Sequence, residues 1–431
     1  MARSLLIICY YWPPAGGPGV QRWLKFTSYL LELGYKIDLI VPDNPDYPVL
    51  DHSLTAEIPK DLNIIKVPIF EPSRLAGSLS RKRTKTLQKG ILSKESSPIE
   101  RFFIWLRGNL FVPDARIGWK KRVVENAQQY IDANPHATVI TTGPPHSVHL
   151  SGLELRNRNS RIKWLADFRD PWTTIGYHKD LKLGRRAKNK HLALETEVLK
   201  TADAVVVTSP HTQKEFQEKT SQPVKLITNG FDLSPNSNVE QPSGDFTLSH
   251  VGTLLSERNP EVLWNVLSDL CKENQEFAND FTLNLAGNVS DEVLKSIKGF
   301  GLQTHLNNLG YLNHNQATDL MYNSQCLLLI EIDSAETKAI IPGKLFEYLA
   351  SRRPIIALGP KEADIKTLIQ ENDAGVFHEY NEEVALKKTI LKFYDHYKQG
   401  NNASNPSDHF LKYHRRQTTQ SLAEEIERLW E

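Results

Sequence analysis

The sequence predicts an α/β protein built from two doubly wound domains, each with a parallel sheet between layers of helices. Short apolar runs that are typical of buried strands alternate with segments of helical periodicity along most of the chain. The alternation stops in a stretch rich in Pro, Ser, Asn and Gly after Gly230 and then restarts. With 431 residues, 40% of them hydrophobic, the chain can give each domain its own core.

The N-terminal half begins with one βαβ unit. Residues 4–10 and 36–42 are expected to be strands, and between them apolar residues recur at helical spacing from Val20 until Gly34 ends the helix. Because helices between parallel strands cover both faces of a sheet, the same rhythm predicts a parallel sheet. Its further strands are expected at residues 63–70, 137–142, 162–168, 202–209 and 224–230.

The second half repeats this pattern. Helices are expected to start at Pro260 and Pro342, and strands are expected at residues 246–252, 281–287, 307–312, 326–332 and 354–359. The predicted domains are therefore residues 1–235 and 236–408. Residues 409–431 read as an amphipathic helix with no strand after it, and we expect this helix to return to the first domain.

Composition and charge exclude several classes of protein. Lys plus Arg number 52 against 51 acidic residues, and no nucleic-acid-binding motif is present, so the sequence predicts no nucleic-acid partner. Three cysteines lie far apart without metal-like spacing, which predicts reduced thiols and no bound metal. The apolar run from Leu5 to Trp12 is too short to span a membrane. We therefore expect a cytoplasmic protein.

The first motif, PPAGGPGVQR, lies between the first strand and the first helix. Gly16, Gly17 and Gly19 let the backbone come close to a ligand, and amides at a helix N-terminus can receive a hydroxyl, phosphate or carboxylate group. Arg22 could help to hold an anion. It also occupies the position where a dinucleotide fingerprint needs its third glycine, which argues against a nicotinamide-dependent oxidoreductase. A plain βα turn is the alternative.

Two further motifs end strands of the same predicted sheet. LADFRDPWTT places Asp167, Arg169 and Asp170 together, which suits an acid/base site or a site for sugar hydroxyls. The alternative is an Asp–Arg structural pair with Trp172 in the core. TTGPPHS places His146 at the same edge, either as a helix cap or as an acceptor-side ligand contact.

The fourth motif, PGKLFEYLASRRPIIAL, begins a helix of the second half. Lys344 follows Gly343 at the helix start, where the helix dipole disfavours a cation unless an anion is bound there. A phosphate would be met by helix amides and Lys344, while Glu347 could accept hydrogen bonds from ribose hydroxyls. A solvated Lys–Glu pair is the alternative. HVGTLLSERNP offers a second anion-ready junction, with Gly252, Arg258 and Asn259 as the helix cap.

These motifs, in this order, resemble glycosyltransferase family 4. Its members have the GT-B architecture, in which two Rossmann-like domains face a central cleft, and they transfer sugar from a nucleotide donor with retention of configuration. The resemblance covers nearly the whole chain. It is carried by PPAGGPGVQR, TNGFD at 228–232, HVGT with the following Arg258, LAGN at 285–288, LGYL at 309–312 and PGKLFEYLASRRPIIAL.

The resemblance implies roles for single residues. The three glycines of the first motif would approach the donor diphosphate or the transferred sugar, Arg258 would stand where the family has a phosphate-binding lysine, and Glu347 would bind ribose. Two positions depart from the family pattern, because Thr253 replaces an arginine and Ala339 replaces the first glutamate of the E-x7-E pattern. Residues that could compensate are Lys344, Asp167, Asp170, Glu336 and Lys338.

The resemblance therefore predicts a hexosyltransferase that needs no metal ion and no cofactor beyond its nucleotide-diphosphate-sugar substrate. The acceptor would be a saccharide or a lipid-linked saccharide in the biosynthesis of a cell-surface polysaccharide. The two departures from the pattern support the alternative of a non-catalytic protein that binds a nucleotide sugar or acts as a scaffold on the same fold.

An irregular insert at residues 75–125 interrupts the first domain. Within it, residues 81–122 combine clustered Lys and Arg with aromatic and aliphatic side chains, which suits peripheral contact with the inner leaflet of a membrane. In that case the acceptor would be lipid-linked. The alternative is a helical hairpin packed on the first domain, with a solvated charge run.

Overall fold

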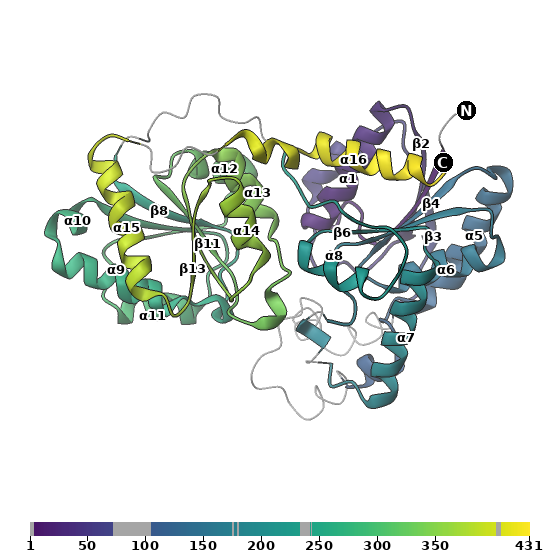
Figure 1. Ribbon diagram of the computed structural model, residues 1–431, viewed down its shortest axis with the longest axis horizontal. Helices are drawn as coiled ribbons and strands as arrows, with labels where there is room; N and C mark the ends of the chain where they lie inside the picture. Colours follow the sequence, from purple (N-terminus) through teal and green to yellow (C-terminus); the bar gives the residue numbers. More distant parts are fainter. Residues whose placement is uncertain are drawn as a thin grey trace. The chain divides into compact units, whose positions relative to one another are not determined.

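The chain forms two compact units in a computed structural model (Figure 1). Unit 1 consists of Met1–Asn229 together with Arg415–Glu431, and unit 2 consists of Gly230–His414. The structure describes residues 4–71, 105–174, 176–178, 181–232, 242, 244–401 and 407–431. Residues 72–104, which hold most of the predicted insert, lie outside this set.

Unit 1 is a seven-stranded parallel sheet with the strand order β3-β2-β1-β4-β5-β6-β7. Its strands are β1 (Ser4–Cys9), β2 (Lys36–Asp43), β3 (Asn63–Pro68), β4 (Thr138–Gly143), β5 (Lys163–Phe168), β6 (Ala204–Val207) and β7 (Val224–Leu226). Its helices are α1 (Pro18–Glu32), α5 (Lys120–Ala133), α6 (Ser147–Arg158), α7 (Arg185–Thr201), α8 (Pro210–Gln217) and α16 (Arg415–Arg428).

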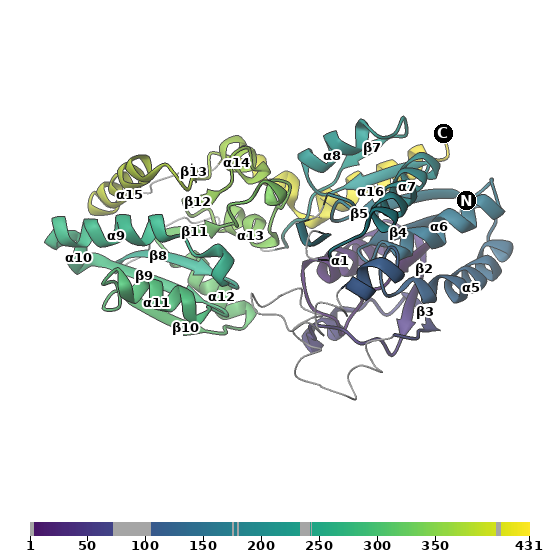
Figure 2. The same ribbon diagram turned by 90° about the horizontal axis from the view of Figure 1, so that it is seen from below.

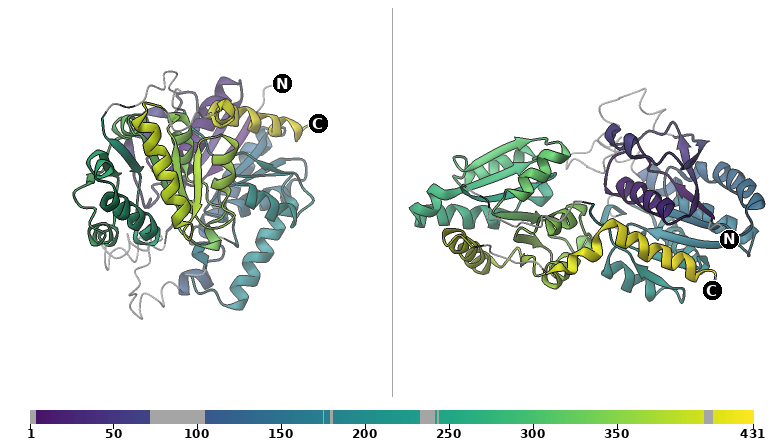
Figure 3. Two further views of the ribbon diagram at one scale, coloured as in Figure 1. Left: turned by 60° about the vertical axis from the view of Figure 1, so that its left-hand side comes forward. Right: turned by 90° about the horizontal axis from the view of Figure 1, so that it is seen from above.

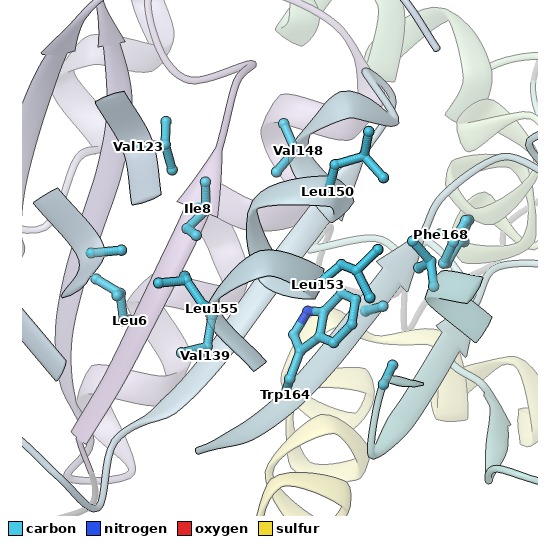
Figure 4. Packing of buried hydrophobic residues seen from close by; sticks show 14 of the residues in the cluster. Leu6, Ile8, Val123, Val139, Val148, Leu150, Leu153, Leu155, Trp164 and Phe168 are labelled. Carbon is cyan, nitrogen blue, oxygen red and sulfur yellow. The ribbon is translucent and has the colours of Figure 1, made fainter. Parts of the chain in front are cut away.

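Each strand of unit 1 contributes to two cores because successive side chains point to opposite faces of the sheet. In β1, Leu6 and Ile8 join the core under α5, α6, α7 and α8, whereas Leu5 and Ile7 join the core under α1 and α16. Figure 4 shows the first of these cores, in which side chains of α6 lie over β1, β4 and β5. Both faces are therefore covered, as a parallel sheet requires.

The C-terminal helix α16 belongs to unit 1 and packs beside α1, as the views from the front and from above show (Figures 1 and 3). Leu422 and Ile426 are buried in the core that α1 also covers. The Tyr35 hydroxyl donates to Glu427 over 3.2 Å. The prediction that the last helix returns to the first domain is confirmed.

Unit 2 is a six-stranded parallel sheet with the order β10-β9-β8-β11-β12-β13 and helices on both faces (Figure 2). Its strands are β8 (Phe246–Val251), β9 (Phe281–Ala286), β10 (Leu306–Gly310), β11 (Cys326–Ile330), β12 (Ile355–Gly359) and β13 (Gly375–Glu379). Its helices are α9 (Glu261–Glu273), α10 (Gln275–Asp280), α11 (Asp291–Gly299), α12 (His314–Tyr322), α13 (Gly343–Ser351), α14 (Asp364–Glu371) and α15 (Glu383–Lys398).

The predicted α/β class with two doubly wound parallel sheets is confirmed, and three details differ. The strand expected at 224–230 ends at Leu226, and β13 had not been predicted. The prediction that Asn259 caps α9 is wrong, because its Oδ1 accepts a hydrogen bond from the Trp264 indole over 2.8 Å and Pro260 occupies the cap position. The buried Trp264 indole needs a hydrogen-bond acceptor, and the Asn259 side chain serves as that acceptor and does not cap the helix.

The strand orders identify where ligands can bind. In unit 1, successive strands are added on one side of β1 as far as β3 and on the other side from β4 onward. In unit 2, the order reverses in the same way between β8 and β11. In open α/β sheets, ligands bind outside the carboxyl ends of the strands at such switch points. PPAGGPGVQR follows β1, TTGPPHS follows β4 and HVGT follows β8, so these three motifs lie at the strands that meet there, whereas LADFRD follows β5, the neighbour of β4.

Candidate functional site

The switch point of unit 2 is a place where two neighbouring strands separate early. The ladder between β8 and β11 includes only the pairs Leu248–Cys326 and Ser249–Leu327. One residue further on, side chains replace the backbone ladder. The His250 Nδ1 lies 3.0 Å from the Leu328 carbonyl oxygen, and the Val251 amide donates to the Tyr348 hydroxyl over 2.9 Å. Polar side chains thus satisfy backbone groups that the sheet no longer pairs.

Lys344 lies in the first turn of α13 at this switch point. Its Nζ is 3.2 Å from the His250 Nε2 and 3.6 Å from the point where a Cβ on Gly252 would lie. Burial lowers the pKa of Lys344 to about 8, the Glu331 carboxylate opposes this shift, and the Arg258 guanidinium adds to it. The ammonium is therefore held beside the strand end, although the helix dipole disfavours a cation there.

Glu331 and Arg258 complete this group of charges. Glu331, which follows β11, is 1% exposed, and its Oε2 lies 3.1 Å from the Arg258 Nη2. Burial raises the pKa of Glu331, while Arg258 and Lys344 lower it. The Glu331 Oε1 and the Arg258 Nε are buried and have no hydrogen-bond partner among the described residues. One carboxylate thus faces two cations, which leaves positive charge available for an anion.

Gly252 has a backbone reason to be glycine. Its φ is 122°, and the neighbouring Gly287, with φ 116°, could not carry a Cβ because that atom would collide with the Gly252 carbonyl oxygen. The Gly252 amide also donates to Ala286 over 2.8 Å. The loops after β8 and β9 therefore touch backbone to backbone at the edge of the site.

The remaining predicted donor residues lie on or near α13. Gly343 is the first residue of the helix, and Glu347 is half-buried one turn after Lys344. Two of the five residues that could compensate for the departures from the family pattern are engaged elsewhere. Lys338 pairs with Glu362 over 2.9 Å, and Glu336 is hydrogen-bonded to Ser334.

Glu331 and His250 were not among the residues predicted from the sequence. The available signal was a polar residue at the end of an otherwise apolar strand, in CLLLIE and in LSHV. Only the strand order shows that these two strand ends are neighbours.

In unit 1, Asp167 and Arg22 form a buried network at the core of the β1–β4 switch point. Asp167 is fully buried and accepts hydrogen bonds from the Trp23 indole at 2.7 Å, from the Thr142 hydroxyl at 2.9 Å and from Arg22 at 3.0 Å. Arg22 also donates to the Thr228 carbonyl over 2.7 Å. Burial lowers the pKa of Arg22, and Asp167 opposes this shift. This geometry gives both residues a structural role.

The position of Arg169 gives a structural reason for the glycine at position 19, which was predicted to bind a ligand. Its guanidinium donates to the Gly143 and Pro144 carbonyl oxygens, and a Cβ on Gly19 would collide with it. Gly16 packs in a similar way against the 49–51 loop. Gly17, with φ 114°, would have open space around a Cβ.

Asp170 is the acidic side chain of the second motif that remains available. It is half-buried, and within the described residues it forms no hydrogen bond or ion pair. Burial raises its pKa, and the neighbouring Arg169 opposes this shift. A carboxyl group with a raised pKa at the carboxyl end of a strand is a candidate acid or base.

His146 occupies the N-cap position of α6, but its side chain makes no capping hydrogen bond. The Asp114 carboxylate instead accepts from the Ser147 amide over 2.8 Å. The His146 ring is buried and stacks on Trp172 with 5.1 Å between centroids. Within the part of the chain that the structure describes, neither of its nitrogens has a hydrogen-bond partner. Trp172 is likewise part of the core. Burial lowers the pKa of His146 well below its usual range.

The described residues also bear on three other features, namely a membrane-spanning helix, a metal site and a disulfide. None of the helices there has the length and apolar character needed to cross a bilayer. The same residues contain no group of three or more His, Cys, Asp or Glu side chains that could hold a metal ion. Cys9, Cys271 and Cys326 are free thiols.

The two parallel sheets and the returning helix define the chain as a protein with the GT-B fold, which confirms the fold that the resemblance implied. No protein-family model and no curated protein sequence matches the chain. The fold is instead shared with solved structures of low sequence identity.

Three such structures illustrate the range. A mutant of S. aureus TarM in a complex that includes UDP has a TM-score of 0.59 at 10% identity, covering 99% of both chains. WaaG, a glycosyltransferase involved in lipopolysaccharide biosynthesis, has a TM-score of 0.52 at 10% identity, covering 97% of this chain and 95% of that one. The N-terminal domain of Candida albicans trehalose-6-phosphate phosphatase has a TM-score of 0.62 at 11% identity, covering 100% and 97%. Such similarities show the fold, and function must be argued from the site.

The two aspartates of LADFRD should differ in their effect on stability. We expect Asp167→Asn to lower the free energy of unfolding of unit 1 by about 3–5 kcal/mol, since it leaves the Arg22 charge buried without its partner. The matched variant Asp170→Asn removes a carboxylate with no described partner and should change stability by less than about 1 kcal/mol. Urea unfolding of both variants is the measurement. Equal losses would contradict the structural role of Asp167.

The stability of unit 1 should fall in mild acid. Burial lowers the pKa values of His149 to about 3 and of His178 to about 4, and it also lowers those of His146 and His191. Below pH 6.5 the unfolded chain therefore binds more protons than the folded chain, so stability is present above that pH and is lost as the pH falls.

Each buried histidine that stays neutral should account for about 1.4 kcal/mol of lost stability between pH 7.5 and 5.5. The control is His146→Phe, which keeps the stacking on Trp172 but cannot be protonated, and its loss should be smaller by about that amount. Urea unfolding at the two pH values measures both proteins. An identical pH dependence would show that His146 is not held neutral.

Proposed function

We propose that the protein is a glycosyltransferase that uses a nucleotide-diphosphate sugar, with the diphosphate bound at the switch point of unit 2. The observation that carries this proposal is the convergence of Lys344, Arg258 and the N-terminus of α13 beside the carboxyl ends of β8 and β11. Two cations and free helix amides form a site for a doubly charged phosphate group. Glu347, one turn along α13, is the candidate for the ribose hydroxyls.

The same charges provide the main catalytic effect in this proposal. When the bond between the sugar and the diphosphate breaks, negative charge grows on the leaving phosphate, and Lys344, Arg258 and the helix amides stabilise it. Because these groups carry positive charge themselves, we propose that no metal ion is needed. Glu331 holds the two cations in place through its contact with Arg258 and its charge beside Lys344.

Unit 1 would supply the acceptor side. Asp170 and Arg169, with the open backbone at Gly17, are the residues that we propose contact acceptor hydroxyls or the transferred sugar. Asp167, Arg22 and His146 act behind them by holding this edge of the sheet in shape. The resemblance supports transfer of a hexosyl group with retention to a saccharide or lipid-linked acceptor of a cell-surface polysaccharide.

A non-catalytic protein that binds a nucleotide sugar or acts as a scaffold is the second candidate. It is favoured by Ala339 and Thr253, which stand where the resemblance expects a glutamate and an arginine. Hydrolysis or transfer of the sugar from a bound donor would exclude this candidate, whereas binding without turnover would support it.

Nucleotide binding is the first test. We expect one of UDP, GDP, ADP, CDP and dTDP to raise the thermal midpoint of the wild-type protein, since a ligand that binds only the folded state stabilises it. Lys344→Ala and Arg258→Ala should each weaken that binding about 10–100-fold, because each removes a charge-assisted hydrogen bond.

Lys388→Ala, which removes an exposed lysine from α15, is the matched control and should bind as the wild type does. Absence of a shift with all five diphosphates would overturn the donor site. Unchanged affinity in both site variants would move it elsewhere in the chain.

We also propose that unit 1 attaches to a membrane surface, as a peripheral protein on the cytoplasmic side. Residues 181–192 contain Lys182, Arg185, Arg186, Lys188 and Lys190 without an acidic residue, and all five are exposed. The helical residues 105–110 are tied to this segment, because Asn109 accepts from the Gly184 amide over 2.7 Å. They add the exposed side chains of Trp105 and Leu110. Cations beside apolar side chains suit an anionic lipid surface.

Vesicle sedimentation tests this attachment. The protein should bind vesicles of equal parts phosphatidylglycerol and phosphatidylcholine, release them at high salt, and ignore pure phosphatidylcholine. Arg185→Ala/Arg186→Ala should weaken binding about 30-fold, at about 1 kcal/mol for each cation. The control pair Lys295→Ala/Lys298→Ala on α11 should not. Binding that is indifferent to lipid charge would contradict the proposal.

A further inference from the structure

His250 is a central residue of the unit 2 site that could not itself touch a ligand. It has no exposed surface, and both of its ring nitrogens have partners. Nδ1 lies 3.0 Å from the Leu328 carbonyl oxygen and Nε2 lies 3.2 Å from the Lys344 Nζ. The ring therefore bridges the end of β11 and the beginning of α13.

These two partners determine which nitrogen of His250 carries the proton. The Leu328 carbonyl can only accept a hydrogen bond, so Nδ1 must be the N–H donor. In a neutral ring, Nε2 is then the acceptor, and the Lys344 ammonium, which can only donate, matches it. A neutral imidazole next to a charged lysine satisfies both hydrogen bonds.

α13 has a second anchor on the same strand. Lys344 and Tyr348 are four residues apart and so lie on one face of the helix. Lys344 contacts His250, and Tyr348 accepts a hydrogen bond from the amide of the next residue, Val251, over 2.9 Å. Two consecutive residues of β8 thus hold two consecutive turns of α13.

We propose that His250 is a positioning residue, whose neutral Nδ1–H tautomer holds the Lys344 ammonium at the place where the donor diphosphate binds. This proposal rests on the proposed function, because it needs Lys344 to contact the diphosphate. His250 acts through Lys344 only. Its contact with the ammonium fixes the orientation of the Lys344 side chain, which is long and otherwise flexible.

The surrounding charges are compatible with this role. The groups that act on Lys344 are Glu331 from the end of β11 and Arg258 from the loop after β8. Burial lowers the pKa of His250 well below its usual range. The Lys344 ammonium and Arg258 add to this shift, and backbone hydrogen bonds with Leu328 and Thr253 oppose it, so the ring stays neutral beside the lysine. The pKa of Lys344, at about 8, leaves the ammonium form in the majority at neutral pH.

Two amide substitutions separate the two hydrogen bonds of His250. Asn places its amide near the position of Nδ1, so His250→Asn can keep the bond to Leu328 but cannot reach Lys344. Gln places its amide near the position of Nε2, so His250→Gln can still accept from Lys344. By calorimetry with the five nucleoside diphosphates, we expect His250→Asn to weaken binding about tenfold or more and His250→Gln to stay within about threefold of wild type.

The double variant His250→Asn/Lys344→Ala shows whether His250 acts through Lys344. In the Lys344→Ala background, His250→Asn should have no further effect on affinity. Additive losses would overturn the proposal. If Lys344→Ala weakens binding and His250→Asn does not, only the positioning role fails. If the wild type binds none of the five diphosphates, the proposed donor site itself fails.

The pH dependence of diphosphate affinity distinguishes a positioning role of His250 from a purely structural one. Affinity of the wild type should fall as the pH rises above about 8, because the ammonium is lost. In His250→Asn the fall should begin at a lower pH, since the ammonium has lost an acceptor. An equal loss of affinity at every pH would show that His250 only supports the fold.

A measurement on the wild-type protein keeps the proposal testable if His250→Asn does not fold. Long-range ¹H–¹⁵N spectra of histidine-labelled protein report the tautomer of each ring, and His250→Gln identifies the His250 signals by their loss. We expect a neutral ring with the proton on Nδ1 that does not titrate between pH 6 and 9. A proton on Nε2, or a charged ring, would overturn the proposal.

Discussion

The early separation of β8 from β11 is the constraint on which the site of unit 2 depends. Two parallel strands that part at a switch point leave backbone groups that the ladder no longer pairs, and buried groups of this kind need other partners. His250 and Tyr348 supply them, and both side chains tie α13 to β8. The requirement to satisfy the backbone thus also determines where the Lys344 ammonium lies. Positive charge at this edge is a consequence of how the sheet ends.

The two units differ in the balance of buried charges at their switch points. At the switch point of unit 1, one buried cation meets one buried carboxylate, and the Trp23 and Thr142 side chains complete the shell of Asp167. In unit 2, the single carboxylate of Glu331 faces both Arg258 and Lys344. A balanced pair suits a rigid edge, whereas an excess of cations suits an anionic ligand. The excess of positive charge therefore favours unit 2 as the unit that binds the donor diphosphate.

The glycine-rich loop shows how a motif can be recognised and still be explained incompletely. The density of glycines in PPAGGPG correctly marked a place of close backbone approach. For Gly19, however, the approaching group is the Arg169 guanidinium, and for Gly16 it is the 49–51 loop. Sequence distance conceals such partners, because Arg169 follows another strand of the sheet. Of the three glycines in this loop, Gly17 alone combines open space, as far as the described residues show, with a backbone conformation that favours glycine.

Apolar periodicity predicts the alternation of strands and helices, the two sheets and the return of the last helix, because it is a local property that burial imposes on each element. Lys344 and Arg258 could also be identified from the sequence, since both stand in recognisable helix-start motifs. That Arg22 and Asp167 face each other, and that Glu331 and His250 join Lys344, became visible only in the folded protein. These pairings join residues from separate elements of the chain, and their energies depend on burial and strand order, which no local pattern records.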